Sequence, residues 1–337
     1  MNKIFITGAT GYVGQRVALH LAAKGYLVHA LVRSPQKSGL LNHPGITLFN
    51  GDISNKESLK AASAGCDVCI HSAGFSALYA PNPKLYHDIN VKGSQLVFEA
   101  ARENNLRKFI YISTAGVLGP SLNGPVNEYS PRKVPFFNEY ETTKAKAEEW
   151  LLANTADTMP VASLNLTRVY GPGQLSEANA GTRLMLNVMK GWRIVPGNGE
   201  SIGNYVYIDD VVTACESAIT RAVGGHRYII GGENLSFNRY FEVVKSVSGA
   251  QQKMISLPVS VILLMAYTMQ ALAVFGVKPY ITPPWVRRYM YNWVLDVTKA
   301  REHLEYNPTS FEEGVKKTIN WLKSLETQNS KETFVNA

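Results

Sequence analysis

Near its N-terminus the chain reads Thr7-Gly8-Ala9-Thr10-Gly11-Tyr12-Val13-Gly14, directly after a short apolar run at residues 4–6 and before a helical pattern. In a strand–turn–helix unit, Gly8 permits the tight turn, Gly11 lets the backbone approach a pyrophosphate, and Gly14 lets helix and strand pack closely. The unpaired N–H groups at the start of the helix attract phosphate. This context favours a dinucleotide-binding loop over a plain turn. The expected cofactor contacts in it are Gly8, Thr10, Gly11, Tyr12, Val13 and Gly14.

Apolar runs and helical patterns alternate outward from this loop. The apolar runs lie at residues 27–32, 46–49, 68–73, 109–112 and 161–166, and the helical patterns at 12–23, 85–103 and 140–153. Buried strands that alternate with helices form a parallel sheet covered on both faces. We therefore predict an α/β fold, a Rossmann-type doubly wound parallel sheet, with a dinucleotide-binding domain over residues 1–168.

The second half of the chain is less regular. Helical patterns at residues 209–221, 236–247 and 311–322 accompany a short strand at 228–230. We expect residues 169–326 to form a smaller mixed α/β substrate lobe that returns some elements to the sheet. The polar residues 327–337 are expected to fray. A division of this kind suits a chain of 337 residues, because single cores usually stop growing at roughly 250–300 residues.

Composition and charge exclude several classes of protein. The net charge is +8, but no run of five basic residues occurs, and nucleic-acid binding would need a clustered basic footprint. Three cysteines exclude a disulfide framework. Cys66 and Cys69 lack a second pair to complete a zinc site, so we expect buried thiols and no metal. No signal peptide is visible, which favours a cytoplasmic location.

The end of the second apolar run bears on the choice of cofactor. An acidic residue there would hold the ribose 2′-hydroxyl of NAD, whereas this chain has Arg33 and Lys37, which suit the 2′-phosphate of NADP(H). A solvated surface arginine is the alternative. After the third run, Asp52 and its neighbour Ile53 are placed to meet the adenine, although Asp52 also suits a turn or helix cap. We predict NADP(H), with NAD(H) as the alternative.

Tyr140 and Lys144 lie four residues apart, on one face of the predicted helix. A free phenol has a pKa near 10, and a neighbouring ammonium favours its ionised form. Tyr140 is therefore the candidate acid or base, and Lys144 is expected to assist it and to bond the nicotinamide ribose. Upstream, Ser113 and Thr114 end an apolar run. A small hydroxyl at the carboxyl end of a strand faces the cofactor crevice, where Thr114 would bond the substrate oxygen.

Taken together, these residues resemble the extended short-chain dehydrogenase/reductase family over essentially the whole chain. The matching motifs are the TGxxGxxG loop at 7–14, Asn90-Val91-Lys92-Gly93, Ser113-Thr114, the YxxxK helix at 140–144 and Arg168-Val169-Tyr170-Gly171-Pro172-Gly173. Within the family, the chain is most similar to the dihydroflavonol-reductase-like branch. That branch includes bacterial hopanoid-associated epimerase-like proteins and is close to the 3β-hydroxysteroid dehydrogenases. The stretches at 205–211 and 227–234 fit it.

The resemblance implies a catalytic triad of Thr114, Tyr140 and Lys144, with Asn90 in support. It also implies cofactor contacts, for which the candidates are Ala73, Gly74, Ser113 and Val169. Two residues depart from common patterns of the family. Tyr207 stands where many relatives have His, and Arg168 stands where galactose epimerases have an Asn that meets the nucleotide. The second departure weakens a sugar-nucleotide interpretation.

The segment from Met254 to Val277 carries no charged residue and is flanked by Lys253 and Lys278. Its length reaches the roughly 20 residues that span a bilayer, but Pro258 and other polar or helix-breaking positions dilute it. We expect a core helix or an apolar wall over the substrate. The alternatives are peripheral contact with a membrane surface and a true span.

The sequence thus favours an NADP(H)-dependent oxidoreductase acting on a carbonyl or secondary alcohol of a small or apolar, lipid- or steroid-like substrate. The first alternative is an NAD-dependent nucleotide-sugar epimerase or dehydratase, which would keep its cofactor bound. The second is a dinucleotide-binding sensor without activity, which would need no acid/base pair. A small-molecule substrate is the expected partner, and a homodimer is left open.

Overall fold

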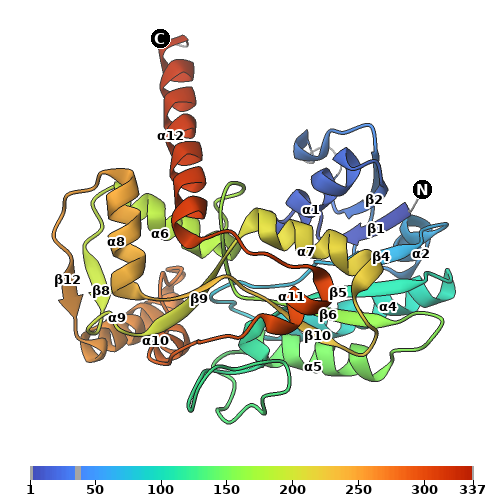
Figure 1. The fold of residues 1–337 in the computed structure, drawn as a ribbon, viewed down its shortest axis with the longest axis horizontal. Coiled ribbons are helices and arrows are strands. Elements are labelled where there is room, and N and C mark those ends of the chain that lie inside the picture. The colour runs from blue at the N-terminus through green and yellow to red at the C-terminus, as the bar shows by residue number, and fades with distance from the viewer. Residues whose placement is uncertain (1–2, 35–38, 336–337) are drawn as a thin grey trace.

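The computed structural model describes the backbone of residues 3–34 and 39–335. Its centre is a seven-stranded sheet, drawn in Figure 1, with the order β10-β6-β5-β4-β1-β2-β3 and only parallel pairings. The strands are β1 (Lys3–Thr7), β2 (Leu27–Val32), β3 (Ile46–Asn50), β4 (Val68–His71), β5 (Lys108–Thr114), β6 (Val161–Leu166) and β10 (Arg227–Ile230). Strand order reverses between β1 and β4, which opens a crevice at their carboxyl ends. The doubly wound prediction is confirmed.

Helices cover both faces of this sheet. One face packs against α1 (Tyr12–Ala23), α7 (Ile208–Arg221) and α11 (Thr298–Leu304), and the other against α2 (Lys56–Ser63), α4 (Ser94–Glu103) and α5 (Glu139–Ala153). Alternation along β1 explains the two layers, since Ile4 and Ile6 belong to the core under α1 and Phe5 to the core on the opposite face. The predicted helix at 85–103 consists of α3 (Lys84–His87), a π-helical turn (Asp88–Gly93) and α4.

The remaining elements form the smaller lobe. A three-stranded sheet holds β7 (Arg168–Tyr170), β9 (Ile202–Tyr207) and β11 (Glu233–Ser236), and a two-stranded sheet holds β8 (Ile194–Pro196) and β12 (Ile255–Leu257). The helices are α6 (Ala180–Met189), α8 (Phe237–Ser248), α9 (Val259–Leu272), α10 (Pro283–Tyr289) and α12 (Phe311–Val335). Short 3-10 turns are η2 (Gly39–Leu41), η4 (Ala115–Val117), η5 (Glu177–Asn179) and η6 (Ala273–Phe275). As expected for this half of the chain, β10 returns to the main sheet beside β6.

Two parts of the second half differ from the sequence-based expectation. α12 continues to Val335 and projects from the body (Figure 1), whereas the residues from 327 onward were expected to fray. α9 was expected to be a core helix or an apolar wall over the substrate, but Ala266 is the only buried residue of α9 and Leu264 is 69% exposed. The core-helix alternative is wrong, because most side chains of α9 stay accessible to solvent although α10 packs against this helix. Among the described residues, no helix is both long and apolar enough to cross a membrane.

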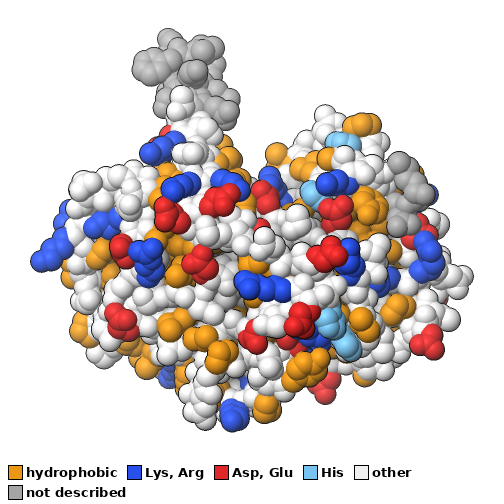
Figure 2. Space-filling model, viewed as in Figure 1, with side chains coloured by type: hydrophobic (Ala, Val, Ile, Leu, Met, Phe, Trp, Pro, Cys, Tyr) orange, Lys and Arg blue, Asp and Glu red, His pale blue; other side chains and the backbone are white. Residues whose placement is uncertain are grey.

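The charges on one face of the molecule are dispersed rather than gathered. On the face shown in Figure 2, Lys and Arg side chains alternate with Asp and Glu side chains. On α12, Lys316 and Lys317 each pair with a glutamate one helical turn earlier. Charges of alternating sign leave no continuous basic patch on this face of the kind that nucleic acid would require.

Candidate functional site

The glycine loop between β1 and α1 is built so that side chains would not fit. Gly8 has a φ of +71°, which disfavours other residues, and a Cβ added to it would lie 2.5 Å from the Ala73 nitrogen. A Cβ added to Gly14 would lie 2.2 Å from the Gly8 oxygen. The helix starts at Tyr12 without a side-chain cap, so its first N–H groups stay available for phosphate.

The other candidate residues of the loop differ in exposure. Thr10 and Gly11 are exposed, Val13 is partly buried, and the buried Tyr12 side chain donates a hydrogen bond to the Gly171 oxygen (3.1 Å). Tyr12 therefore anchors the loop to the segment after β7, and its backbone is the part that is left to meet a cofactor.

The candidate residues for the adenosine half lie at the ends of β2 and β3. Arg33 is exposed at the end of β2, and Lys37 lies outside the described residues. Asp52 accepts hydrogen bonds from the backbone nitrogen (2.9 Å) and hydroxyl (2.7 Å) of Ser54. These bonds, with a smaller contribution from the charge of Arg33, lower the pKa of Asp52. Asp52 thus stabilises its own turn, one of its two predicted roles, while Ile53 packs near Gly93.

The proton-transfer candidates meet at the carboxyl end of β5. Asn138 caps α5 by accepting a hydrogen bond from the Glu141 nitrogen (2.9 Å), which places Tyr140 in the first turn of the helix. Thr114 ends β5, and its hydroxyl accepts a hydrogen bond from the Gly116 nitrogen (3.1 Å). Lys144 is buried and donates to the Ile112 oxygen (2.7 Å). The sheet edge and one helix face therefore bring all three residues of the predicted triad together.

Burial sets the acidity of the candidate pair. It raises the pKa of Tyr140 to about 12, against the lowering influence of the Arg288 charge and of hydrogen bonding with Thr114. It lowers the pKa of Lys144 to about 7, although the charge of Glu148 opposes the shift. Lys144 was expected to lower the pKa of Tyr140, but its ammonium lies against the Ile112 oxygen and the Tyr111 ring (3.8 Å to the centroid). The cation that lowers the pKa of Tyr140 is Arg288.

Arg288 is the residue near the pair that the sequence did not single out for a role. Its Nε donates to Glu141 Oε1 (2.8 Å), while Arg132 Nη2 donates to Glu141 Oε2 (3.1 Å). Glu141 is buried, and the Arg288 guanidinium lies 4.1 Å from the centre of the Trp293 ring. Two arginines share one carboxylate, so a net positive charge lies beside Tyr140. The contact links α10 to α5 across 147 positions, and no local pattern signals it.

The predicted supporting residue Asn90 connects the loop after β4 to the helix that carries Tyr140. Its Oδ1 accepts from the Phe75 nitrogen (2.7 Å), and its Nδ2 donates to the Thr143 hydroxyl (3.0 Å). The remaining candidates lie around the same crevice. Ala73 donates to the Thr7 hydroxyl (3.3 Å), Gly74 is exposed, Val169 is buried, and the buried Ser113 hydroxyl has no hydrogen-bond partner among the described residues.

A buried histidine lies directly under the glycine loop. His71 Nδ1 shares a 2.6 Å hydrogen bond with the Thr7 hydroxyl, and its Nε2 shares a 2.8 Å bond with the Ser94 hydroxyl. Burial, helped by the charge of Lys144, lowers the pKa of His71 to about 3. The ring is therefore neutral at physiological pH and serves to hold β1, β4 and α4 in register.

The low pKa of His71 predicts that the fold loses stability in acid. An unfolded histidine binds a proton near pH 6.5, whereas His71 in the folded chain does so only near pH 3. Between these values the unfolded state holds one more proton, so the free energy of unfolding falls with decreasing pH by up to about 1.4 kcal/mol per pH unit. Denaturant unfolding at pH 7, 6 and 5 measures the slope. His71→Asn should lessen the slope by this amount, and an unchanged slope contradicts the assignment.

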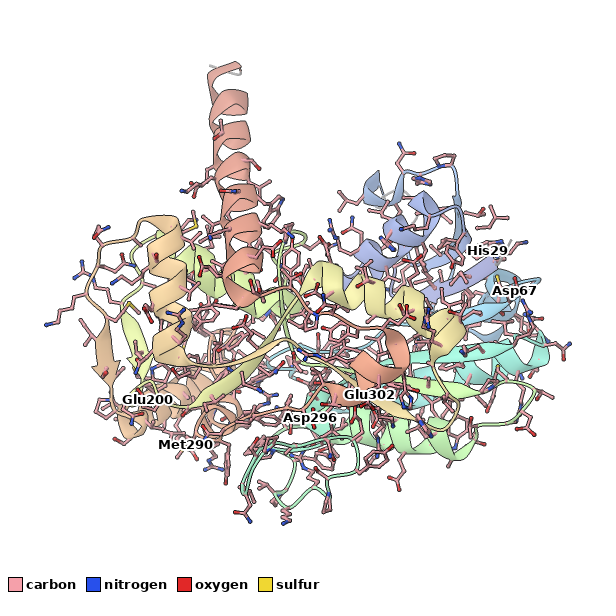
Figure 3. The ribbon with its side chains drawn as sticks, viewed as in Figure 1. His29, Asp67, Glu200, Met290, Asp296 and Glu302 are labelled. Carbon is pink, nitrogen blue, oxygen red and sulfur yellow. The ribbon has the colours of Figure 1, made fainter. Side chains whose placement is uncertain are left out.

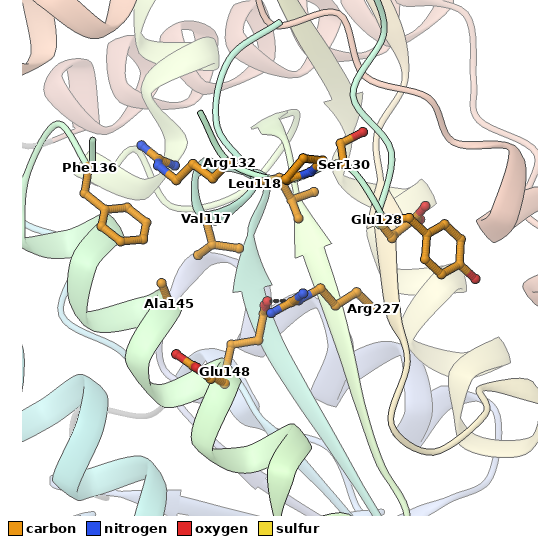
Figure 4. Close-up of a pocket in the computed structure, with 12 residues that line it drawn as sticks. Val117, Leu118, Glu128, Ser130, Arg132, Phe136, Ala145, Glu148 and Arg227 are labelled. Carbon is orange, nitrogen blue, oxygen red and sulfur yellow. Dashed lines mark hydrogen bonds and ion pairs between the residues drawn. The ribbon is translucent and has the colours of Figure 1, made fainter. Parts of the chain in front are cut away.

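A separate cavity of about 340 Å³ lies beside α5 (Figure 4). Its wall includes the ion pair between Arg227 Nε and Glu148 Oε1 (2.5 Å). The other lining residues are Val117, Leu118, Glu128, Tyr129, Ser130, Pro131, Arg132, Phe136, Ala145 and Glu149. It contains none of the three triad candidates, so we do not assign the substrate site to it. Among the described residues there is also no His, Cys, Asp or Glu cluster able to hold a metal, and Cys66 and Cys69 are buried free thiols as predicted.

Comparison with known proteins identifies the family. The model of the NAD dependent epimerase/dehydratase family matches residues 4–231, which include the glycine loop, Thr114, Tyr140 and Lys144. A 3β-hydroxysteroid-dehydrogenase/decarboxylase of Arabidopsis thaliana (isoform 1) is 24% identical over 98% of this chain and 82% of its own. A 2-alkyl-3-oxoalkanoate reductase of Shewanella oneidensis is 25% identical over 94% of this chain and 85% of its own.

Solved structures agree on the fold. The UDP-glucose 4-epimerase of Thermotoga maritima, solved with UDP-glucose, superimposes with a TM-score of 0.78 at 22% identity, over 96% of this chain and 99% of the epimerase. At that identity the likeness shows the architecture alone. Because the family match extends over more than half of the chain and includes the cofactor loop, the chain belongs to the NAD dependent epimerase/dehydratase family of extended short-chain dehydrogenases/reductases and is an NAD(P)-dependent enzyme.

Proposed function

We propose that the protein is an NADP(H)-dependent oxidoreductase that interconverts a carbonyl and a secondary alcohol on an apolar substrate. The observation that carries the proposal is the meeting of Thr114, Tyr140 and Lys144 at the crevice that begins at the glycine loop. We also propose the division into a dinucleotide-binding domain at residues 1–168 and a substrate lobe at 169–326, with β10 returned to the sheet.

The loop residues fit a dinucleotide. Gly8 and Gly14 allow the tight turn and the close approach of α1, because a Cβ at either position would strike backbone atoms, and the exposed start of α1 offers N–H groups to the pyrophosphate. The buried Ser113 hydroxyl is without a partner among the described residues and is suited to the nicotinamide half. When bound, the nicotinamide supplies or accepts the hydride. Lys144 would bond the ribose with an N–H that its bond to the Ile112 oxygen leaves available.

Residues of the protein would transfer the proton to and from the substrate oxygen. With a pKa of about 12, the Tyr140 phenol is protonated at neutral pH and ready to donate to a carbonyl oxygen. The Thr114 hydroxyl would bond the same oxygen and hold the substrate in place. The positive charge of Arg288 lowers the free energy of the phenolate that remains after donation. In the oxidative direction, the phenolate accepts the proton from the alcohol.

Arg33 supports the preference for NADP(H). Its exposed side chain at the end of β2 is free to meet a 2′-phosphate, and charge-assisted bonds contribute about 1.5–3 kcal/mol. Arg33→Glu should therefore weaken NADPH binding by roughly ten- to a hundred-fold and spare NADH. The control Arg102→Glu makes the same charge change on the exposed side of α4. Fluorescence titration measures both cofactors, and tighter binding of NADH than NADPH by the unmodified protein refutes the assignment.

Two observations support an apolar substrate over a sugar nucleotide. Relatives are named for hydroxysteroid and 2-alkyl-3-oxoalkanoate substrates. In addition, Arg168 is held within the lobe, with its Nη1 donating to the Tyr205 hydroxyl (3.0 Å) and its guanidinium 4.9 Å from the centre of the Tyr289 ring. Galactose epimerases have an asparagine at this position that contacts the nucleotide, and Arg168 in this arrangement does not replace that contact. The rival epimerase or dehydratase would hold NAD through its cycle, and a sensor would show no turnover.

A cofactor-consumption screen tests the proposal. The probes are NADPH or NADH with a 3-oxosteroid and a 2-alkyl-3-oxoalkanoate, against UDP-glucose. We expect NADPH to be consumed with an apolar ketone, whereas conversion of UDP-glucose without net cofactor use favours the epimerase. Turnover with none of the probes would contradict this substrate class. A homodimer and a cytoplasmic location stay predictions, for sedimentation and cell fractionation to test.

A further inference from the structure

The surface around α9 is apolar on nearly every side. Leu264 is 69% exposed, and in the turn that follows the helix Phe275 is 83% exposed. Further exposed apolar side chains lie on the same segment and its flanks, and they are Ile255, Val261, Met265, Tyr267, Leu272, Val277, Tyr280 and Met290. Exposed apolar patches of this kind mark surfaces that bind a partner or a membrane. We call these residues, with Leu264 and Phe275, the α9 surface.

The α9 surface lies at one end of the smaller lobe. α9 packs against α10, and both lie at the lower left in Figure 1. Met290, which follows α10, is labelled at the same end in Figure 3. α10 also carries Arg288, whose ion pair with Glu141 connects this end of the lobe to the helix that holds Tyr140. The α9 surface is thus next to the element that contacts the candidate catalytic helix.

The charged side chains of the segment that carries the α9 surface are all basic. Between Glu242 and Asp296 the sequence carries five Lys or Arg residues and no Asp or Glu. Lys253 and Lys278 are exposed and lie before and after α9 in the chain, and the exposed Arg287 of α10 donates to the hydroxyl of Tyr267 on α9 (2.6 Å). Lys278 pairs with Glu177, whereas no carboxylate among the described residues lies within ion-pair distance of Lys253 or Arg287. Apolar side chains rimmed by cations match an anionic lipid surface.

We propose that the α9 surface rests on the anionic face of a lipid bilayer, with α9 in the plane of the interface. The 14 residues of α9 extend roughly 21 Å, less than the roughly 30 Å hydrocarbon core, so the helix lies on the membrane rather than across it. Leu264 and Phe275 enter the acyl boundary, and Lys253 and Arg287 meet the headgroups. The proposal rests on the proposed function in that it names a membrane as the source of the apolar substrate. Membrane binding itself can be measured without any enzymatic reaction.

Co-sedimentation of the full-length protein with vesicles tests the contact. We expect binding to phosphatidylcholine vesicles that contain phosphatidylglycerol, weaker binding at high salt, and little binding to phosphatidylcholine alone. Leu264→Glu/Phe275→Glu should reduce binding at least about tenfold, because each change puts a charge where an apolar side chain enters the lipid. The matched control, Tyr129→Glu/Val223→Glu, alters two exposed apolar side chains beside α11 and β10 and should bind like the unmodified protein.

The possible outcomes distinguish membrane binding from dimerisation through α9 and from failure of the proposed ketone reduction. NADPH titration shows whether each variant is folded, and it is expected to be unchanged in all of them. No binding by the unmodified protein, or equal loss in both double variants, overturns the proposal. If the α9 variant instead converts a dimer to a monomer in sedimentation velocity, without vesicle binding in any form, the surface joins two copies of this chain and the proposal is wrong. Failure to reduce any ketone would leave vesicle binding unaffected.

Discussion

Tyr140→Phe is expected to lower turnover by about 10²–10⁴-fold, the usual contribution of a positioned general acid or base. The substitution removes only the hydroxyl from a residue in the first turn of α5, so the cap at Asn138 and the ion pairs of Glu141 are kept. Cofactor affinity should stay within a few-fold, because the substitution leaves the proposed dinucleotide loop at Gly8–Gly14 unchanged. Initial rates with NADPH and the ketone identified by screening, together with cofactor titration, measure the two effects separately.

The matched control is Tyr129→Phe, which removes a hydroxyl from a side chain that is 74% exposed. It should turn over at the normal rate. Near-normal turnover of Tyr140→Phe would remove this residue from the proton transfer. An equal loss in both variants would indicate a general effect on the fold instead.

Gly14→Ala is expected to damage both stability and cofactor binding. The added Cβ would lie 2.2 Å from the Gly8 oxygen and 2.7 Å from the Gly8 carbonyl carbon, and backbone atoms cannot rotate away. Overpacking costs about 1–3 kcal/mol, which lowers Tm by several degrees. Any shift that relieves the contact moves the start of α1 away from the pyrophosphate, so NADPH affinity should fall at least about tenfold.

Gly39→Ala is the control, because a Cβ added there meets nothing within 4 Å. Its thermal unfolding and NADPH titration should match those of the unmodified protein. A Gly14→Ala protein with normal Tm and normal NADPH affinity would mean that the helix does not need this close approach, and the loop would have to be reassigned.

The features that the sequence predicted are those encoded by neighbouring residues. The glycine loop, the β1–α1 unit and the placement of Tyr140 with Lys144 on one helix face all depend on spacings of a few residues. Parallel order then brings the ends of β1, β4 and β5 to one edge, so the crevice follows from the alternation of strands and helices.

The features that the sequence missed depend on contacts between distant residues. Glu141 pairs with Arg288 across 147 positions, and only the fold brings α10 to the start of α5. For the same reason, the cation that lowers the pKa of Tyr140 could not be read from its helix, where Lys144 was the obvious candidate.

The hydrophobicity of the α9 sequence also did not predict whether its side chains are buried. The apolar composition of α9 suits a core helix, a membrane-surface helix or a pocket wall, and the difference lies in what packs on it. Only Ala266 of this helix is buried.

The fate of the hydride tests the central claim most directly. The protein is incubated with NADPH deuterated at the transferred C4 position and the apolar ketone from the screen, and the product is analysed by mass spectrometry. Net reduction moves the hydride to the carbonyl carbon and a proton to its oxygen, so we expect one deuterium per alcohol and one NADP⁺ per product. Conversion of UDP-glucose to its 4-epimer, with no net loss of NADPH and no deuterated alcohol, would contradict the account.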